Sequence, residues 1–165
     1  QYFSFTVQMP PMKQENALAY FAFLQKQKGS FEDFTIAAPL DNLGAGKAET
    51  DIQVVGSHSV GATSISIDGH QNNNPNAFKS GDFIKFANHS KVYMIVADVS
   101  PSGNASTLTI EPPLINTLAD NEVVTYDNVP FTVYLTSNVQ EFGSVGATKD
   151  GDLLYQFELD VEEAL

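Results

Sequence analysis

The feature that most constrains this chain is the stretch of residues 2–39, where a helical pattern lies between two strand-like segments. Residues 2–8 alternate between polar and apolar side chains, which is the two-residue period of a strand with two different faces. Pro10 and Pro11 end that strand because proline cannot donate a hydrogen bond to a ladder. A second apolar run begins at Phe31 and stops at Pro39, so the stretch predicts strand, helix and strand.

A helix is predicted over residues 14–28, because apolar side chains recur there three or four positions apart. The apolar stripe contains Ala17, Leu18, Phe21 and Leu24, and Tyr20 and Phe23 widen it. Gly29 supplies the left-handed residue that commonly follows a helix end. A helix this apolar on one side must pack on a sheet, and its flanking strands provide the nearest one.

Length and charge limit the classes of protein to which the chain can belong. At 165 residues it is one domain, or one domain with a modest insert, and it has no cysteine for disulfides or thiolate sites. The net charge of −12 argues against binding to nucleic acid or anionic lipid. No apolar run approaches the roughly 20 residues of a membrane span, and no signal-peptide pattern opens the chain. Because the first residue is Gln, we expect further sequence upstream.

Residues 49–127 carry the pattern of a separate small β domain. Five or six short strands follow one another there at intervals of about 8–12 residues, with Gly, Asn and Pro turns between them. The glycine-rich connector at residues 40–50 precedes them. Residues 83–86 and 92–99 are expected to form a hairpin. We therefore expect a small antiparallel barrel or sandwich, inserted into the rest of the chain.

The C-terminal segments return to the alternating pattern. Residues 129–136 and 153–161 are predicted strands, and both are expected to join residues 2–8 and 31–36 in the main sheet under the helix. The predicted fold is therefore mainly β. Residues 1–48 and 128–165 form a β-sandwich with one flanking helix, and residues 49–127 form the insert.

The sequence predicts no catalytic, cofactor-binding or metal-binding residues. His58, His70 and His89 are far apart in sequence and are interpreted as exposed loop residues. The acidic groups at residues 150–152 and 160–163 lack the spacing of a calcium loop, and residues 56–61 miss the Gly-x-Ser-x-Gly pattern. No pair of carboxylates stands out as a general acid and base. The chain is therefore interpreted as a non-enzyme that needs no cofactor.

Several segments resemble tail proteins of long-tailed bacteriophages. Residues 5–39 resemble their strand, proline pair, helix and Gly-Ser-Phe-x-x-Phe segment. Residues 63–69, 78–99 and 107–114 resemble the Gly-Asp hairpin and closing Pro-Pro of a small β module inserted in such proteins. The resemblance covers most of the chain, and its motifs are structural rather than catalytic.

This resemblance implies a structural subunit of the tail tip or baseplate, similar to a distal tail protein. Such a subunit would have a tail-tube-like sandwich, would form a hexameric or trimeric ring with copies of itself, and would join the tail tube to the hub. It would be assembled in the host cytoplasm, would belong to the virion tail, and would bind no nucleic acid sequence-specifically. An acidic subunit also suits a lumen through which DNA passes without sticking.

Two other functions compete with this interpretation. The insert could be a carbohydrate-binding module that recognises the host, but sugar sites need exposed aromatic side chains and its loops offer only Phe78. A hydrolase acting on cell wall or polysaccharide needs a close carboxylate pair or a metal cluster, and the sequence shows neither.

Overall fold

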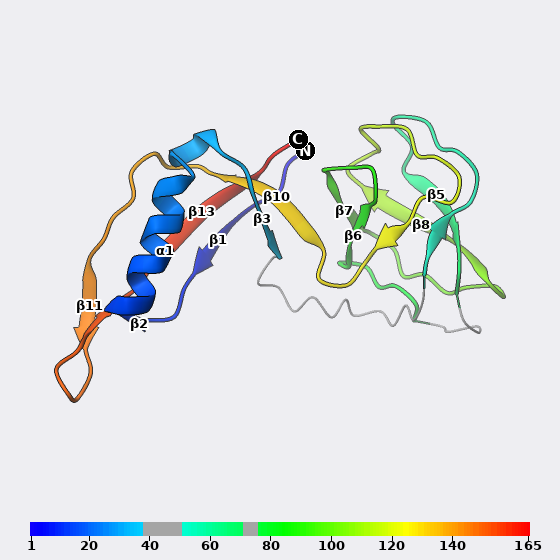
Figure 1. Cartoon of the computed structure of the whole chain (residues 1–165). Helices are drawn as coiled ribbons and strands as arrows, with labels where there is room; N and C mark the ends of the chain where they lie inside the picture. Colours follow the sequence, from blue (N-terminus) through cyan, green and yellow to red (C-terminus); the bar gives the residue numbers. More distant parts are fainter. Residues whose placement is uncertain (38–50, 71–75) are drawn as a thin grey trace. The chain divides into compact units, whose positions relative to one another are not determined.

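The computed structural model describes residues 1–37, 51–70 and 76–165, and its strands outnumber its helical segments (Figure 1). The fold is mainly β, as the sequence predicted. The backbone divides into two compact units. Unit 1 contains residues 1–35 and 132–164, and unit 2 contains residues 36–131 with residue 165. The predicted connector at residues 40–50 lies outside the described residues.

The first sheet has four strands in the order β1 (Ser4–Gln8), β13 (Glu158–Glu163), β10 (Pro130–Leu135) and β3 (Phe34–Ala37). Strand β1 pairs antiparallel with β13 from Ser4 opposite Glu162 to Gln8 opposite Glu158. Strand β10 pairs antiparallel with the other side of β13. The predicted joining with the strands that flank the helix is confirmed for residues 129–136 and for the last part of residues 153–161, but not for residues 153–155.

The second sheet is a hairpin extended by one short strand. Its order is β11 (Ser144–Ala147), β12 (Leu153–Tyr155) and β2 (Met12–Lys13). The prediction of one strand over residues 153–161 was wrong, because the chain changes sheets between β12 and β13. The buried Tyr155 and Phe157 keep the same alternation across the break, but the pairing partners change from β11 and β2 to β1 and β10.

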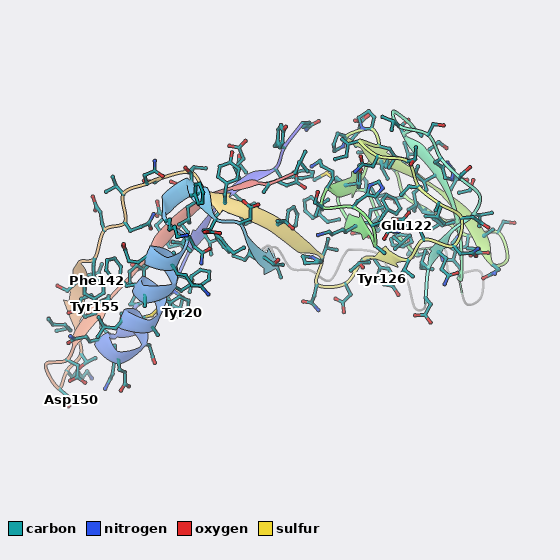
Figure 2. All side chains as sticks on the ribbon, turned by 45° about the horizontal axis from the view of Figure 1, so that its top comes forward. Tyr20, Glu122, Tyr126, Phe142, Asp150 and Tyr155 are labelled. Atoms are coloured by element: carbon teal, nitrogen blue, oxygen red, sulfur yellow. The ribbon has the colours of Figure 1, made fainter. Side chains whose placement is uncertain are left out.

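Helix α1 (Gln14–Lys26) is followed by a 3₁₀ helix (Gly29–Phe31). The buried residues of α1 are Ala17 and Leu24. The ring of Phe21, also in α1, contacts the ring of Phe142, with 4.9 Å between the two centroids. Phe142 in turn stacks on Tyr155 of β12 at 4.7 Å, as the labelled rings in Figure 2 show. The side chains of Leu18, Tyr20 and Phe23, which the sequence placed in the apolar stripe, are exposed. Successive helical residues point about 100° apart, so these positions turn away from the line through residues 17, 21 and 24.

The end of α1 depends on two consecutive left-handed residues. Lys28 has φ 55° and Gly29 has φ 69°, which confirms the left-handed position predicted at residue 29. A Cβ atom on Gly29 would collide with the side chain and backbone of Asn138. The backbone at Gly29 lies this close to Asn138 because Asn138 Oδ1 accepts a hydrogen bond from the backbone N–H of the next residue, Ser30, at 2.9 Å.

We expect Gly29→Ala to lower the free energy of unfolding by about 2–4 kcal/mol, because it combines an unfavourable φ with a clash. Gly151→Ala is the matched control, since Gly151 also has a positive φ, 89°, but no atom lies within 4 Å of the position that its Cβ would take. Gly151→Ala should lower the free energy of unfolding by about 1 kcal/mol. Urea unfolding followed by circular dichroism measures both, and equal losses would contradict the role given to Asn138.

Unit 2 contains a six-stranded antiparallel sheet in the order β4-β5-β8-β7-β6-β9, which curls into a nearly closed barrel. Its strands are β4 (Gln53–Val54), β5 (Ser64–Asp68), β6 (Phe83–Phe86), β7 (Val92–Ile95), β8 (Ala105–Glu111) and β9 (Val124–Thr125). The two edge strands meet, because the N–H of Val54 donates to the carbonyl of Glu122 and the N–H of Val124 donates to the carbonyl of Ile52, both at 2.9 Å. The predicted hairpin of residues 83–86 with residues 92–99 is confirmed as β6 and β7.

The barrel core follows the strand alternation in the sequence. Ile65 and Ile67 of β5 are fully buried, whereas their polar neighbours in the strand are not. The core also contains large side chains from all around the barrel, including Ile84, Phe86, Tyr93, Ile95, Leu108 and Ile110.

A buried carboxylate, Glu122, fixes two loops of the barrel (Figure 2). Its Oε1 accepts a hydrogen bond from the N–H of Asn88 at 2.9 Å, and its Oε2 accepts one from the N–H of Ala119 at 3.2 Å. A carboxylate can satisfy two backbone donors at once, which apolar side chains of similar size cannot do. Glu122 is therefore a structural residue of the barrel.

Glu122→Ala should lower the free energy of unfolding by about 1–3 kcal/mol, because the backbone N–H groups of Asn88 and Ala119 lose their shared carboxylate acceptor. Glu122→Gln keeps one acceptor oxygen and should lose about half as much. Glu111→Ala, at an exposed position in β8, serves as the control and should stay within about 0.5 kcal/mol of the unmodified protein. A loss for Glu122→Ala no larger than for the control would contradict this role.

Candidate functional site

The four-stranded sheet of unit 1 has one face with no helix on it, and that face is acidic. Alternation in β1 and β13 puts the buried residues Val7, Leu159 and Val161 on the helix side. The opposite face carries Ser4, Thr6 and Gln8 from β1, Glu158, Asp160 and Glu162 from β13, and Thr132 and Tyr134 from β10. We call these eight residues the acidic face. It contains three carboxylates and no cationic side chain.

Hydroxyl groups order the carboxylates of the acidic face. Thr6 Oγ1 donates to Asp160 Oδ1 at 2.6 Å across the β1–β13 pair. Desolvation raises the pKa of Tyr134, and the nearby charge of Glu162 and a hydrogen bond with it add to the effect. The phenol of Tyr134 therefore remains protonated and neutral at physiological pH. Such a surface presents fixed negative charge and can repel a polyanion, but it offers no nucleophile or base aimed at a substrate.

The edges of this sheet carry no charged side chain. Strand β1 reads SFTVQ and strand β3 reads FTIA, whereas the central strand β13 reads ELDVEE. Soluble monomers usually protect sheet edges with charges, prolines or bulges, because bare edges pair with other strands. Here the charges lie in the centre of the sheet, and within residues 1–37, 51–70 and 76–165 no further strand pairs with the outer side of β1 or β3. This distribution is typical of a sheet whose edges are covered by other chains.

The three histidines do not lie where the sequence placed them. His70 and His89 were interpreted as exposed loop residues, but only 6% and 4% of their surfaces are exposed. His70 Nε2 contacts Ser106 Oγ at 2.7 Å, and His89 Nδ1 contacts Tyr93 Oη at 3.0 Å. Both rings find polar partners, which compensates for their burial. His58 is partly buried, and its Nε2 accepts a hydrogen bond from the N–H of Ser66 at 3.3 Å.

The acidic groups considered for calcium also have ordinary structural roles. Asp150 and Gly151 form the turn between β11 and β12, and Asp152 forms an exposed ion pair with Lys13 at 2.7 Å. Asp160 and Glu162 belong to the acidic face, and buried Glu163 accepts a hydrogen bond from the N–H of Phe3 at 3.2 Å. Within residues 1–37, 51–70 and 76–165, no three His, Cys, Asp or Glu side chains gather as a metal site would require.

The one aromatic residue that could have served a sugar site is part of the barrel core. Only 2% of Phe78 is exposed, and its ring packs edge-on against Tyr126 at 5.6 Å and against His70 at 6.1 Å. It therefore cannot form a flat platform under a sugar ring. No helix in the described part of the chain is long and apolar enough to cross a membrane.

A comparison with protein-family models identifies the barrel. The model of the B domain of distal tail protein pb9 matches residues 46–129, which is just over half of the chain. The chain belongs to this family. The resemblance to distal tail proteins of phages is thereby confirmed, and a structural rather than enzymatic role agrees with it. A search of curated proteins found no match.

The burial of His70, within the residues that match the family model, predicts a pH dependence of stability. Desolvation lowers the pKa of His70, and the charge of Asp68 opposes this only partly. The unfolded chain therefore binds the proton more readily than the folded chain. The free energy of unfolding accordingly falls as the pH drops below the pKa of His in the unfolded chain, about 6.5.

Thermal unfolding of the unmodified protein and of His70→Gln between pH 7.5 and 5 tests this expectation. Gln can keep a hydrogen bond with Ser106 but cannot take up a proton. The melting temperature of the unmodified protein should fall further over this pH range than that of the variant. Equal losses would mean that His70 does not contribute to the pH dependence.

Proposed function

We propose that the protein is a structural subunit of a phage tail tip that forms a ring with copies of itself and joins the tail tube to the hub. The family supports a tail protein. The single observation that carries the ring is that β1 and β3, the two outer strands of one sheet, contain no charged residue. Two different edges that pair with each other between copies make a head-to-tail contact, and such contacts give a ring when the rotation between copies closes.

The proposal gives different roles to two parts of the chain. Residues 1–48 and 128–165 form the part that assembles, and residues 49–127 form an inserted β domain. The ring is a hexamer or a trimer, its partners are the tube and hub proteins, and its place is the virion tail after assembly in the host cytoplasm. The burial of Phe78 disfavours the alternative of a carbohydrate-binding module.

The acidic face supports an orientation for the ring. We propose that it lines the lumen, because carboxylates on a lumen wall repel the phosphates of passing DNA. The helix and the apolar side of the sheet then face outward. Hydroxyl and carboxylate side chains suit such a wall, since they stay hydrated and offer no cation to hold a phosphate.

Light scattering and negative-stain images of the full chain at near-physiological salt test the ring. Closed hexamers or trimers are expected. Thr35→Lys places a charge at an exposed position on the β3 edge and should weaken association at least tenfold, or about 1.4 kcal/mol.

Thr107→Lys is the matched control, because Thr107 is an exposed strand residue in the centre of the barrel sheet. It should leave the mass distribution unchanged. A protein that remains monomeric at every concentration, or a ring that tolerates Lys at position 35 as well as at position 107, would contradict the proposal.

A further inference from the structure

The turn between β11 and β12 contains an aspartate followed directly by a glycine. Asp150 and Gly151 are both exposed, and Figure 2 shows Asp150 at the tip of the hairpin. The N–H of Gly151 donates to the carbonyl of Thr148, inside the same turn, at 3.0 Å. Apart from its chain neighbours, no atom of the described residues lies within 4 Å of the position that a Cβ on Gly151 would take. The peptide bond between Asp150 and Gly151 can therefore change its orientation without displacing another segment of the described chain.

The sequence contains a second pair of this kind, Asp68 and Gly69, and the barrel holds that pair in place. Asp68 belongs to β5, which pairs with β4 on one side and with β8 on the other. The N–H of Gly69 donates to Asn104 Oδ1 at 3.0 Å. A Cβ atom on Gly69 would collide with the backbone carbonyl of Asp51, so that segment packs directly against the glycine. The two pairs have the same sequence but very different surroundings.

An aspartate that precedes a glycine can react with its own backbone. The nitrogen of the glycine attacks the side-chain carbon Cγ. The N–Cγ bond forms, the nitrogen gives up its proton, and an oxygen of the carboxyl group leaves as water. Glycine favours this step because no Cβ hinders the approach to its nitrogen or the backbone rotation that the approach needs.

The product of this attack is a five-membered succinimide ring, which water opens again. Addition of water at Cγ restores aspartate, whereas addition at the backbone carbonyl gives isoaspartate, in which the main chain runs through Cβ and Cγ. One water leaves and one water enters. The mass is therefore unchanged, and the reaction needs no other reactant.

We propose that residue 150 is a site of spontaneous isoaspartate formation in the folded protein and that residue 68 is protected from it. Ring closure requires the peptide bond after the aspartate to turn toward the side chain. At Asp150 only the surrounding turn has to rearrange. At Asp68 the hydrogen bond to Asn104 must break and the segment at Asp51 must move away, which requires local opening of the barrel sheet.

The modification would change unit 1 at a defined place. Isoaspartate lengthens the backbone of the turn by one carbon, between strands that pair with Ala147 opposite Leu153. The next residue, Asp152, forms the ion pair with Lys13, which directly precedes helix α1. The added carbon therefore lies beside the contact between the hairpin and the start of the helix. The inference does not depend on the proposed ring, because every group involved belongs to one chain.

Peptide mapping of the aged full chain tests the proposal. The folded protein is kept for about three weeks at neutral pH and about 37 °C in water enriched in the heavy oxygen isotope. Each passage through the succinimide leaves a heavy oxygen in the residue, so mass spectrometry of the peptides reads the two sites separately. Methylation by protein isoaspartyl methyltransferase then measures the isoaspartate itself. We expect at least about tenfold more conversion at residue 150 than at residue 68.

Two controls separate the fold from the local sequence. Asp150→Glu keeps the charge but would need a larger ring, so it should remove the isoaspartate at position 150. In the chain unfolded by urea, residues 68 and 150 should convert at similar rates, because the contacts that protect residue 68 are gone.

The outcomes decide the proposal without reference to assembly. A preference for residue 150 that is present in the folded chain and disappears in urea supports it. Equal conversion at the two sites of the folded chain, or no conversion at residue 150, overturns it. A preference that persists in urea also overturns it, because neighbouring residues rather than the fold would then be the cause. Failure of the chain to form rings would contradict the proposed function and leave this inference standing.

Discussion

The pairing of β1 with β13 is the constraint on which the rest of unit 1 depends. It joins the first strand of the chain to the last over five residue pairs, from Ser4 opposite Glu162 to Gln8 opposite Glu158. Strand β10 completes the other side of β13, and the helix then has a continuous apolar surface on which to pack. Contacts between the two ends of a chain carry a large loop-closure cost. The barrel, whose strands lie within residues 53–125, needs no such long-range closure between the chain ends.

The charged side chains of this sheet lie in its central strand rather than at its edges. A strand with the sequence ELDVEE would protect an edge well, yet it lies in the centre, where its carboxylates form a face instead. Uncharged strands take the two edges. A protein of net charge −12 can associate with itself only where the charges are kept out of the contact. In the proposed ring, this arrangement keeps the carboxylates of β13 away from the two outer strands.

The polar residues that attract attention in a search for catalysis are used to hold the barrel together. Glu122 accepts hydrogen bonds from two loops, and His70 and His89 contact hydroxyl groups inside the structure. Buried polar groups of this kind make a loop-rich domain rigid because each has a specific partner. The family match to a distal tail protein domain fits this picture, in which the side chains support a shape rather than a reaction.

The sequence by itself determined the elements whose signal is local. The two-residue period predicted the strand that carries Ile65 and Ile67, Gly29 marked the end of the helix, and alternation in residues 153–161 gave the correct buried face for Tyr155 and Phe157. These features follow from backbone geometry and from side chains a few positions apart.

Only the tertiary structure decided which partners those elements take. Strand β11 has small, exposed residues with no apolar alternation, and it exists because β12 folds back against it. The switch from β12 to β13 depends on different neighbouring strands, and the burial of His70 depends on Ser106, which lies 36 residues away. Phe23 of the helix is only partly covered, by the ring of Phe34 in β3, and that contact also joins segments that the sequence pattern does not link. Such contacts depend on where distant segments meet, and a local sequence pattern holds no information about that.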